Sequence, residues 1–203
     1  MGKIVFECEN ISVEMGGANP NQHELRPASF KGVMRFWWRA INGDLPLNKL
    51  KKQEDEIFGS TEKKSSFSIK IKNDKFKGNR IPKNHKFKIE FVLSNRCDLD
   101  IEIFFKIVVL LGGFGKSAKK QNMGKIKILK IQRDSKEWIN YREPNHLNDI
   151  LILLGDKFKI QNNEIVSKDF KFNYPMIHKI WIDNRVLKTK LKEDKIFQRE
   201  LDV

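Results

Sequence analysis

The sequence predicts an α+β fold, with a β-α-β-β-α-β module over residues 1–133 and a C-terminal α/β extension over residues 134–203. Segments in which apolar and polar residues alternate, as in half-buried strands, are separated by segments with the apolar spacing of helices. The chain has 203 residues, of which 39% are hydrophobic, enough to form a packed core. The order of elements in the first module is that of a ferredoxin-like (RRM-like) domain.

Each element of the first module is predicted from a local pattern. Pro27 and Ser29 supply start signals for the first helix, whose apolar residues from Phe30 to Ile41 fall on one face. Asp98 or Asp100 could cap the second main helix, and a shorter helical piece ends at residues 57–59. The strands are expected at residues 3–8, 66–72, 86–93 and 125–131, and the main helices at 30–41 and 101–111.

The extension is predicted to begin with a helix over residues 145–154. Strands are expected at 164–172 and 177–182, followed by a polar closing helix over 187–201. The extension could pack on the first domain or form part of a second module, and the sequence leaves this open.

The positive charge is concentrated in the first module. The chain has 40 Lys and Arg against 26 Asp and Glu, a net charge of +14, of which +13 lies in residues 1–133. Such an excess on a folded chain favours nucleic acid first and an acidic membrane second as partners. No acidic residue occurs between Glu102 and Asp134. That interval holds eight bases: Lys106, Lys116, Lys119, Lys120, Lys125, Lys127, Lys130 and Arg133.

Neither a membrane span nor a metal or cofactor site is expected. The most apolar stretch, residues 101–111, is interrupted by charges and is shorter than a bilayer requires, and the amino terminus has no signal-peptide core. Cys8 and Cys97 form neither a metal-ligand pair nor a disulfide framework. We expect a cytoplasmic protein without a cofactor.

Two clusters are candidates for phosphate binding. In the loop over residues 112–124, glycines expose backbone N–H groups, and lysines and a serine add further donors. The order helix, loop, strand argues against a phosphate-loop NTPase. On the first helix, Lys31, Arg35 and Arg39 form a basic stripe. Trp37 is expected in the core, whereas Trp38, at the border of the stripe, could be core or could stack on an unpaired base.

Catalysis is not predicted. His23 lies in a glycine-rich loop where a general base could act on RNA, but no catalytic partner is evident, and an exposed loop histidine is an equally simple explanation. The acidic run at residues 54–56 is expected to be a solvated helix face rather than a metal site.

The segment Glu24-Leu-Arg-Pro-Ala-Ser-Phe-Lys-Gly-Val-Met-Arg-Phe-Trp-Trp-Arg-Ala resembles the signature of the RAMP superfamily of CRISPR proteins, and within it the first RAMP subunit of the type III-B Cmr effector complex. Supporting positions are Gly16-Gly17, residues 57–60 and the loop over 113–117. The resemblance covers residues 13–131, and none is claimed for 134–203. Family members usually carry two ferredoxin-like modules, whereas this chain has one convincing module and a tail.

The resemblance implies a non-catalytic subunit that binds single-stranded RNA, contacting guide RNA near its 3′ region, target RNA, or both, and that assembles with other Cmr subunits. One alternative is a RAMP-type endoribonuclease that processes guide precursors, with His23 as base. Another is a structural subunit whose RNA contacts form only after assembly. The implied RNA-binding residues are Arg26, Lys31, Arg35, Trp38, Arg39, Gly113, Gly115, Lys116, Ser117, Lys119 and Lys120.

Overall fold

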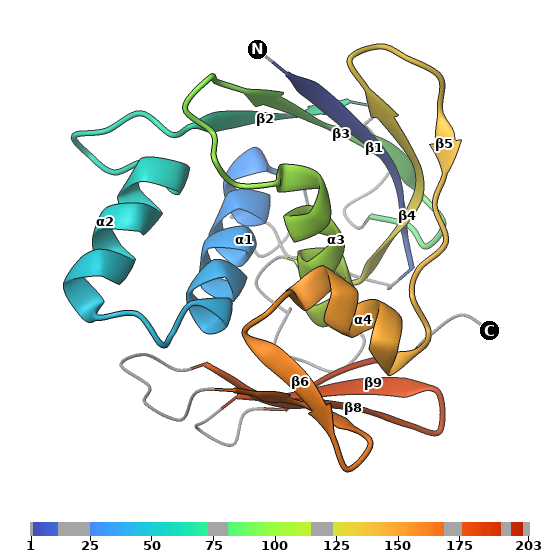
Figure 1. The fold of residues 1–203 in the computed structure, drawn as a ribbon. Helices are drawn as coiled ribbons and strands as arrows, with labels where there is room; N and C mark the ends of the chain where they lie inside the picture. The colour runs from blue at the N-terminus through green and yellow to red at the C-terminus, as the bar shows by residue number, and fades with distance from the viewer. Residues whose placement is uncertain are drawn as a thin grey trace.

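The computed structural model describes residues 2–11, 25–72, 81–114, 124–168, 176–191 and the backbone of 196–200. These residues form a mixed α/β fold with two antiparallel sheets, which confirms the predicted class at this level (Figure 1). The elements are β1 (Lys3–Asn10), α1 (Pro27–Ile41), α2 (Leu47–Phe58), β2 (Phe67–Lys72), β3 (Lys86–Leu93), α3 (Ile101–Leu111), β4 (Ile126–Arg133), β5 (Ile139–Asn140), α4 (Leu147–Leu154), β6 (Phe158–Gln161), β7 (Glu164–Ser167), β8 (Ile177–Asp183), β9 (Val186–Leu191) and β10 (Ile196–Glu200).

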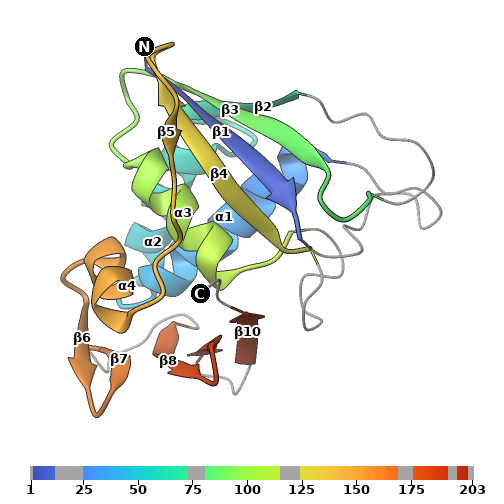
Figure 2. The same ribbon diagram turned by 90° about the vertical axis from the view of Figure 1, so that its right-hand side faces the viewer.

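The first sheet has the strand order β2-β3-β1-β4-β5, and its neighbouring strands are antiparallel. Helices α1 and α3 cover one face of this sheet (Figures 1 and 2). The strands alternate as the sequence predicts, and the face toward the helices carries buried side chains such as Phe6, Ile89 and Phe91. The rings of Phe6 and Phe91 both contact Phe105 of α3, with centroid separations of 4.7 and 5.1 Å. Aromatic packing therefore fixes α3 on the sheet.

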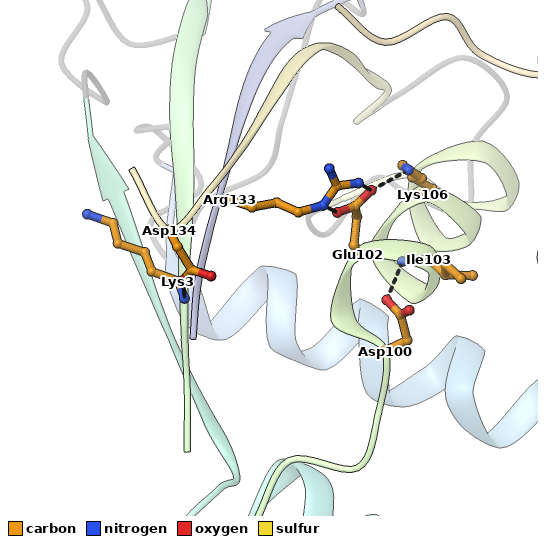
Figure 3. Close-up of polar contacts among 7 residues, drawn as sticks. All are labelled: Lys3, Asp100, Glu102, Ile103, Lys106, Arg133 and Asp134. Carbon is orange, nitrogen blue, oxygen red and sulfur yellow. Dashed lines mark hydrogen bonds and ion pairs between the residues drawn. The ribbon is translucent and has the colours of Figure 1, made fainter. Parts of the chain in front are cut away.

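Polar contacts hold α3 at its first turn (Figure 3). Of the two candidate caps, Asp100 is the one that caps the helix, because its carboxylate accepts a hydrogen bond of 2.9 Å from the N–H of Ile103. Glu102 is buried and pairs with Arg133 of β4 and with Lys106 one turn further along α3. Burial by itself raises the pKa of Glu102, but hydrogen bonds from these two cations outweigh it and hold the pKa below 4.5.

The second sheet has the order β10-β9-β8-β7-β6 and is built from hairpins. The β6–β7 turn has positive φ at Asn162 and Asn163, and the β8–β9 turn has it at Asn184 and Arg185, as two-residue hairpin turns of the primed type require. Helix α4 lies between α3 and this sheet (Figure 1). Buried side chains on both sides of residue 133 form a single hydrophobic cluster.

Several expectations for the extension were wrong or incomplete. The closing helix over 187–201 does not form, because residues 186–191 and 196–200 are the paired strands β9 and β10. The side chains of Leu187, Thr189 and Leu191 are buried in strict alternation, which is the period of a strand. Strands β5 and β6 were not predicted. The strand expected at 164–172 is present as β7 but ends at Ser167, and residues 169–172 lie outside the described part of the chain.

Candidate functional site

One side of helix α1 is buried in the core, and another side faces three adjoining surface hollows. Phe30, Met34 and Trp37 are buried, which confirms the predicted apolar face. The three predicted cations on this helix line the hollows: Lys31, Arg35 and Arg39.

Trp38 belongs to the core. Its side chain is 4% exposed, and its ring packs edge-on against Phe58 at the end of α2, with 6.2 Å between centroids. Base stacking needs an accessible ring face, so of the two roles that the sequence left open for Trp38, core packing is the one that this conformation fits. Trp38 instead extends the apolar packing of α1 to its contact with α2.

The two arginines of the stripe are held by one carboxylate of α2. Arg39 makes a two-pronged contact with Glu54, and Nε of Arg35 lies 3.1 Å from Oε1 of the same residue. Nη2 of Arg35 also donates a 2.6 Å hydrogen bond to the carbonyl of Gly59. Glu54 is only 6% exposed, so the expectation of a solvated acidic face at residues 54–56 was wrong for this residue.

Lys31 lies at the other end of the stripe and has no carboxylate partner among the residues that the structure describes. Its Nζ is 5.2 Å from the centroid of the Phe67 ring. Burial, and secondly the charge of Arg35, lower the pKa of Lys31 from its ordinary value of 10.5. An anion placed beside this ammonium would favour its charged form and so offset the lowering of the pKa.

The loop between α2 and β2 forms the opposite wall of the hollows and is held by its own hydrogen bonds. Gly59 has φ of 82°, and Ser60 Oγ accepts bonds of 3.2 Å from the N–H groups of Glu62 and Lys63. The hydroxyl of Ser65 donates to the carbonyl of Ile57. These contacts give a structural reason for the Ile57-Phe58-Gly59-Ser60 motif.

Three adjoining hollows of about 540, 730 and 610 Å³ run along α1, and we call them together the α1 groove. The first two share Lys31 and Lys64, and the second and third share Arg35 and the loop over 59–62. Lys63 and Lys64 are exposed on the loop wall. The sequence reasoning missed these two lysines, although their position directly after the Ile57–Ser60 motif was an available signal.

The base of the glycine-rich loop is fixed against α1 on its core side. The Phe114 ring lies 4.5 Å from that of Phe30, and the Phe114 N–H donates a 2.7 Å bond to the carbonyl of Gly124. Lys125 is buried and reaches the carbonyl of Gly112 at 3.4 Å.

Gly113 is part of this base, and Arg26 occupies the N-cap position of α1. The other predicted loop residues lie outside the described part of the chain: Gly115, Lys116, Ser117, Lys119 and Lys120. His23 lies outside it as well.

Within the described ranges, no group of three or more His, Cys, Asp or Glu side chains is arranged to hold a metal ion. Cys8 and Cys97 are free thiols, and burial is the main cause that raises the pKa of Cys8. Within the same ranges, no helix has the length and apolarity needed to cross a bilayer.

The family model of the RAMP superfamily matches residues 15–201. The match extends beyond the motifs recognised in the sequence, which end at residue 131, and includes most of the extension. Two curated relatives from Pyrococcus furiosus are the CRISPR system Cmr subunit Cmr1-2, 39% identical over 84 residues, and Cmr subunit Cmr1-1, 41% identical over 51 residues. These matches cover 39% and 24% of this chain, and 45% and 15% of the relatives, so the chain matches less than half of either protein.

Two solved structures share the fold. The crystal structure of apo Cmr1 from Pyrococcus furiosus superposes with a TM-score of 0.53 and 23% identity, over 65% of this chain and 50% of that chain. A chain of the cryo-EM structure of the Type III-B Cmr-beta bound to cognate target RNA gives a TM-score of 0.51 and 13% identity, over 66% and 55%.

Proposed function

Because the chain belongs to the RAMP superfamily, we propose that it is a non-catalytic RNA-binding subunit of a type III-B Cmr effector complex. The names of its curated relatives support the assembly. In this proposal it contacts guide RNA near its 3′ region, target RNA, or both. The observation that carries the RNA-binding part is the α1 groove, because a basic channel beside a helix is a common way to follow a single-stranded phosphate backbone.

The groove offers donors on both walls. Lys31 stands on the helix wall, and Lys63 and Lys64 stand on the loop wall together with the hydroxyl groups of Ser60 and Thr61. Contacts of this kind go to phosphates and sugars and position a strand without reading its bases. Since contacts of this kind do not read the bases, we expect binding with little sequence preference.

We further propose that residues 1–133 form a ferredoxin-like module. The strand order β2-β3-β1-β4, with α1 after β1 and α3 after β3, supports this assignment. The additional helix α2 then acts as an insertion that carries one wall of the groove.

The test is a double substitution on the loop wall, K63A/K64A, with RNA affinity measured by fluorescence anisotropy across a salt series. Each phosphate contact on a single strand contributes about −0.7 to the slope of log K against log salt concentration. Loss of two contacts is therefore expected to flatten the slope by about 1.4 and to weaken binding severalfold at low salt.

The matched control is K136A/K159A, which removes two exposed lysines outside the groove. It should leave the slope nearly unchanged. An equal loss in both variants would mean that only net charge matters, and this would contradict a role for the groove. A separate incubation of the wild type and of H23A with labelled guide precursor distinguishes the proposal from the endoribonuclease alternative, since site-specific cleavage that is lost in H23A would favour the enzyme.

A further inference from the structure

Glu54 is a buried acid in the wall of a basic groove, a placement that simple electrostatics does not favour. A carboxylate there lowers the positive potential that attracts a polyanion. Taking a charge out of water is also unfavourable unless it is paired. Glu54 is paired, and both of its partners are arginines of the predicted stripe.

Glu54 contacts both guanidinium groups without covering either arginine side chain completely. The side chains of Arg35 and Arg39 remain about one third exposed, at 34% and 33%, and both line the same hollow as the loop residues from Gly59 to Glu62. A guanidinium has five N–H donors in a fixed fork. In Arg35, Nη2 donates to the Gly59 carbonyl and Nε lies beside Glu54, so these two contacts do not use every donor of the fork.

We propose that Glu54 is a positioning residue for RNA: it holds Arg35 and Arg39 as two preformed forks that each contact one phosphate of a single strand. This inference rests on the proposed function. The two arginines are one turn apart on α1, a rise of about 6 Å, comparable to the distance between neighbouring phosphates along a nucleic-acid strand. Because the forks are fixed before binding, little side-chain entropy is lost when the phosphates arrive.

The sign of the effect of E54Q distinguishes positioning from charge alone. The substitution makes the groove more positive by one unit, so charge alone predicts tighter RNA binding. Positioning predicts weaker binding, because a glutamine amide presents only one acceptor and its NH₂ group opposes the guanidinium donors. We expect the dissociation constant to rise by about fivefold to twentyfold, within the usual range for lost charge-assisted bonds.

The matched control is E62Q, which removes an exposed acid from the rim of the same groove. It makes the same change in net charge without touching the arginines, and it is expected to bind RNA as tightly as the wild type or more tightly. Both variants are first compared with the wild type by circular dichroism and urea unfolding, so that affinities are read only on folded protein.

A second variant keeps the test decisive if E54Q does not fold. R39K retains the charge of the groove but replaces the fork with a point charge, and it is expected to weaken binding while the salt slope stays unchanged. Folded E54Q that binds RNA as tightly as the wild type, or R39K with unaltered affinity where E54Q fails to fold, would overturn the inference. A wild-type chain that binds no RNA would instead overturn the proposed function.

Discussion

Gly59 determines the shape of the loop wall of the α1 groove. Its φ of 82° and ψ of 161° lie in a region that is essentially restricted to glycine. A Cβ atom there would also lie 2.8 Å from the backbone nitrogen of Ser65 and 2.9 Å from the carbonyl of Lys63. The loop can approach its own start this closely only because position 59 has no side chain.

Gly59→Ala is therefore expected to lower the free energy of unfolding by about 3 kcal/mol, from backbone strain together with the displaced loop. Gly155→Ala is the matched control, because Gly155 has a similar φ of 77° but open space around its missing Cβ. It should show the strain alone, about 1–2 kcal/mol. Urea unfolding measures both, and equal losses would contradict the contribution assigned to the loop contacts.

Individual charges show what the sequence could not predict. The acid-free interval and the basic stripe indicated free cations, yet Lys106 and Arg133 pair with Glu102, and Arg35 and Arg39 pair with Glu54. Arg133 and its carboxylate are 31 residues apart, so only tertiary packing brings them together. Local patterns predicted the apolar face of α1 and limited the cap of α3 to Asp98 or Asp100, because both features depend on neighbours within about one turn.

The hairpins of the second sheet were harder to predict than the helices. Residues 186–191 alternate, but their lysines and short length also fit a polar helix end. The deciding feature is the turn at Asn184 and Arg185, where an arginine occupies a left-handed position that asparagine or glycine usually takes. Because the sequence of this turn is unusual for a hairpin, the strand period of two in residues 186–191 could not be told from the helix period of 3.6.

Helix α3 is joined to β4 by the buried Glu102 ion pairs, and this connection predicts a pH dependence. The pKa of Glu102 is lower in the folded chain than its ordinary value of 4.5. The unfolded chain then takes up the proton first as the pH falls. The stabilisation from Glu102 is complete above about pH 4.5 and is lost as the pH drops through the lower folded value.

Glu102→Gln is expected to reduce stability by about 1.5–3 kcal/mol near pH 7, and the difference from the wild type should shrink as the pH falls below 4.5. Urea unfolding at a series of pH values measures this. Glu137→Gln, at an exposed position, is the matched control and should change little at any pH. A difference that stays constant between neutral and acidic pH would contradict the assignment to the charged carboxylate.

The two sheets share one core, and this predicts that the chain unfolds as a unit although its charge and elements divide near residue 133. Ile150 of α4 is 1% exposed and belongs to the same hydrophobic cluster as Phe105 of α3 and Ile180 of β8. Ile150→Ala removes buried apolar volume at the junction and should cost about 2–4 kcal/mol. Since α3 also supports the first sheet, the loss should reach both sheets.

Hydrogen exchange measures where the loss appears. Amides of the central strands β1 and β8 are expected to lose protection by the same free energy in Ile150→Ala, as in a cooperative unit. Ile152→Ala on the same helix, where the side chain is 77% exposed, should change either strand by no more than about 0.5 kcal/mol. Loss of protection in β8 with β1 unchanged would show two separate units, and the α1 groove would then be independent of the extension. Equal loss in both strands would mean that the extension stabilises the helix and sheet that support the groove.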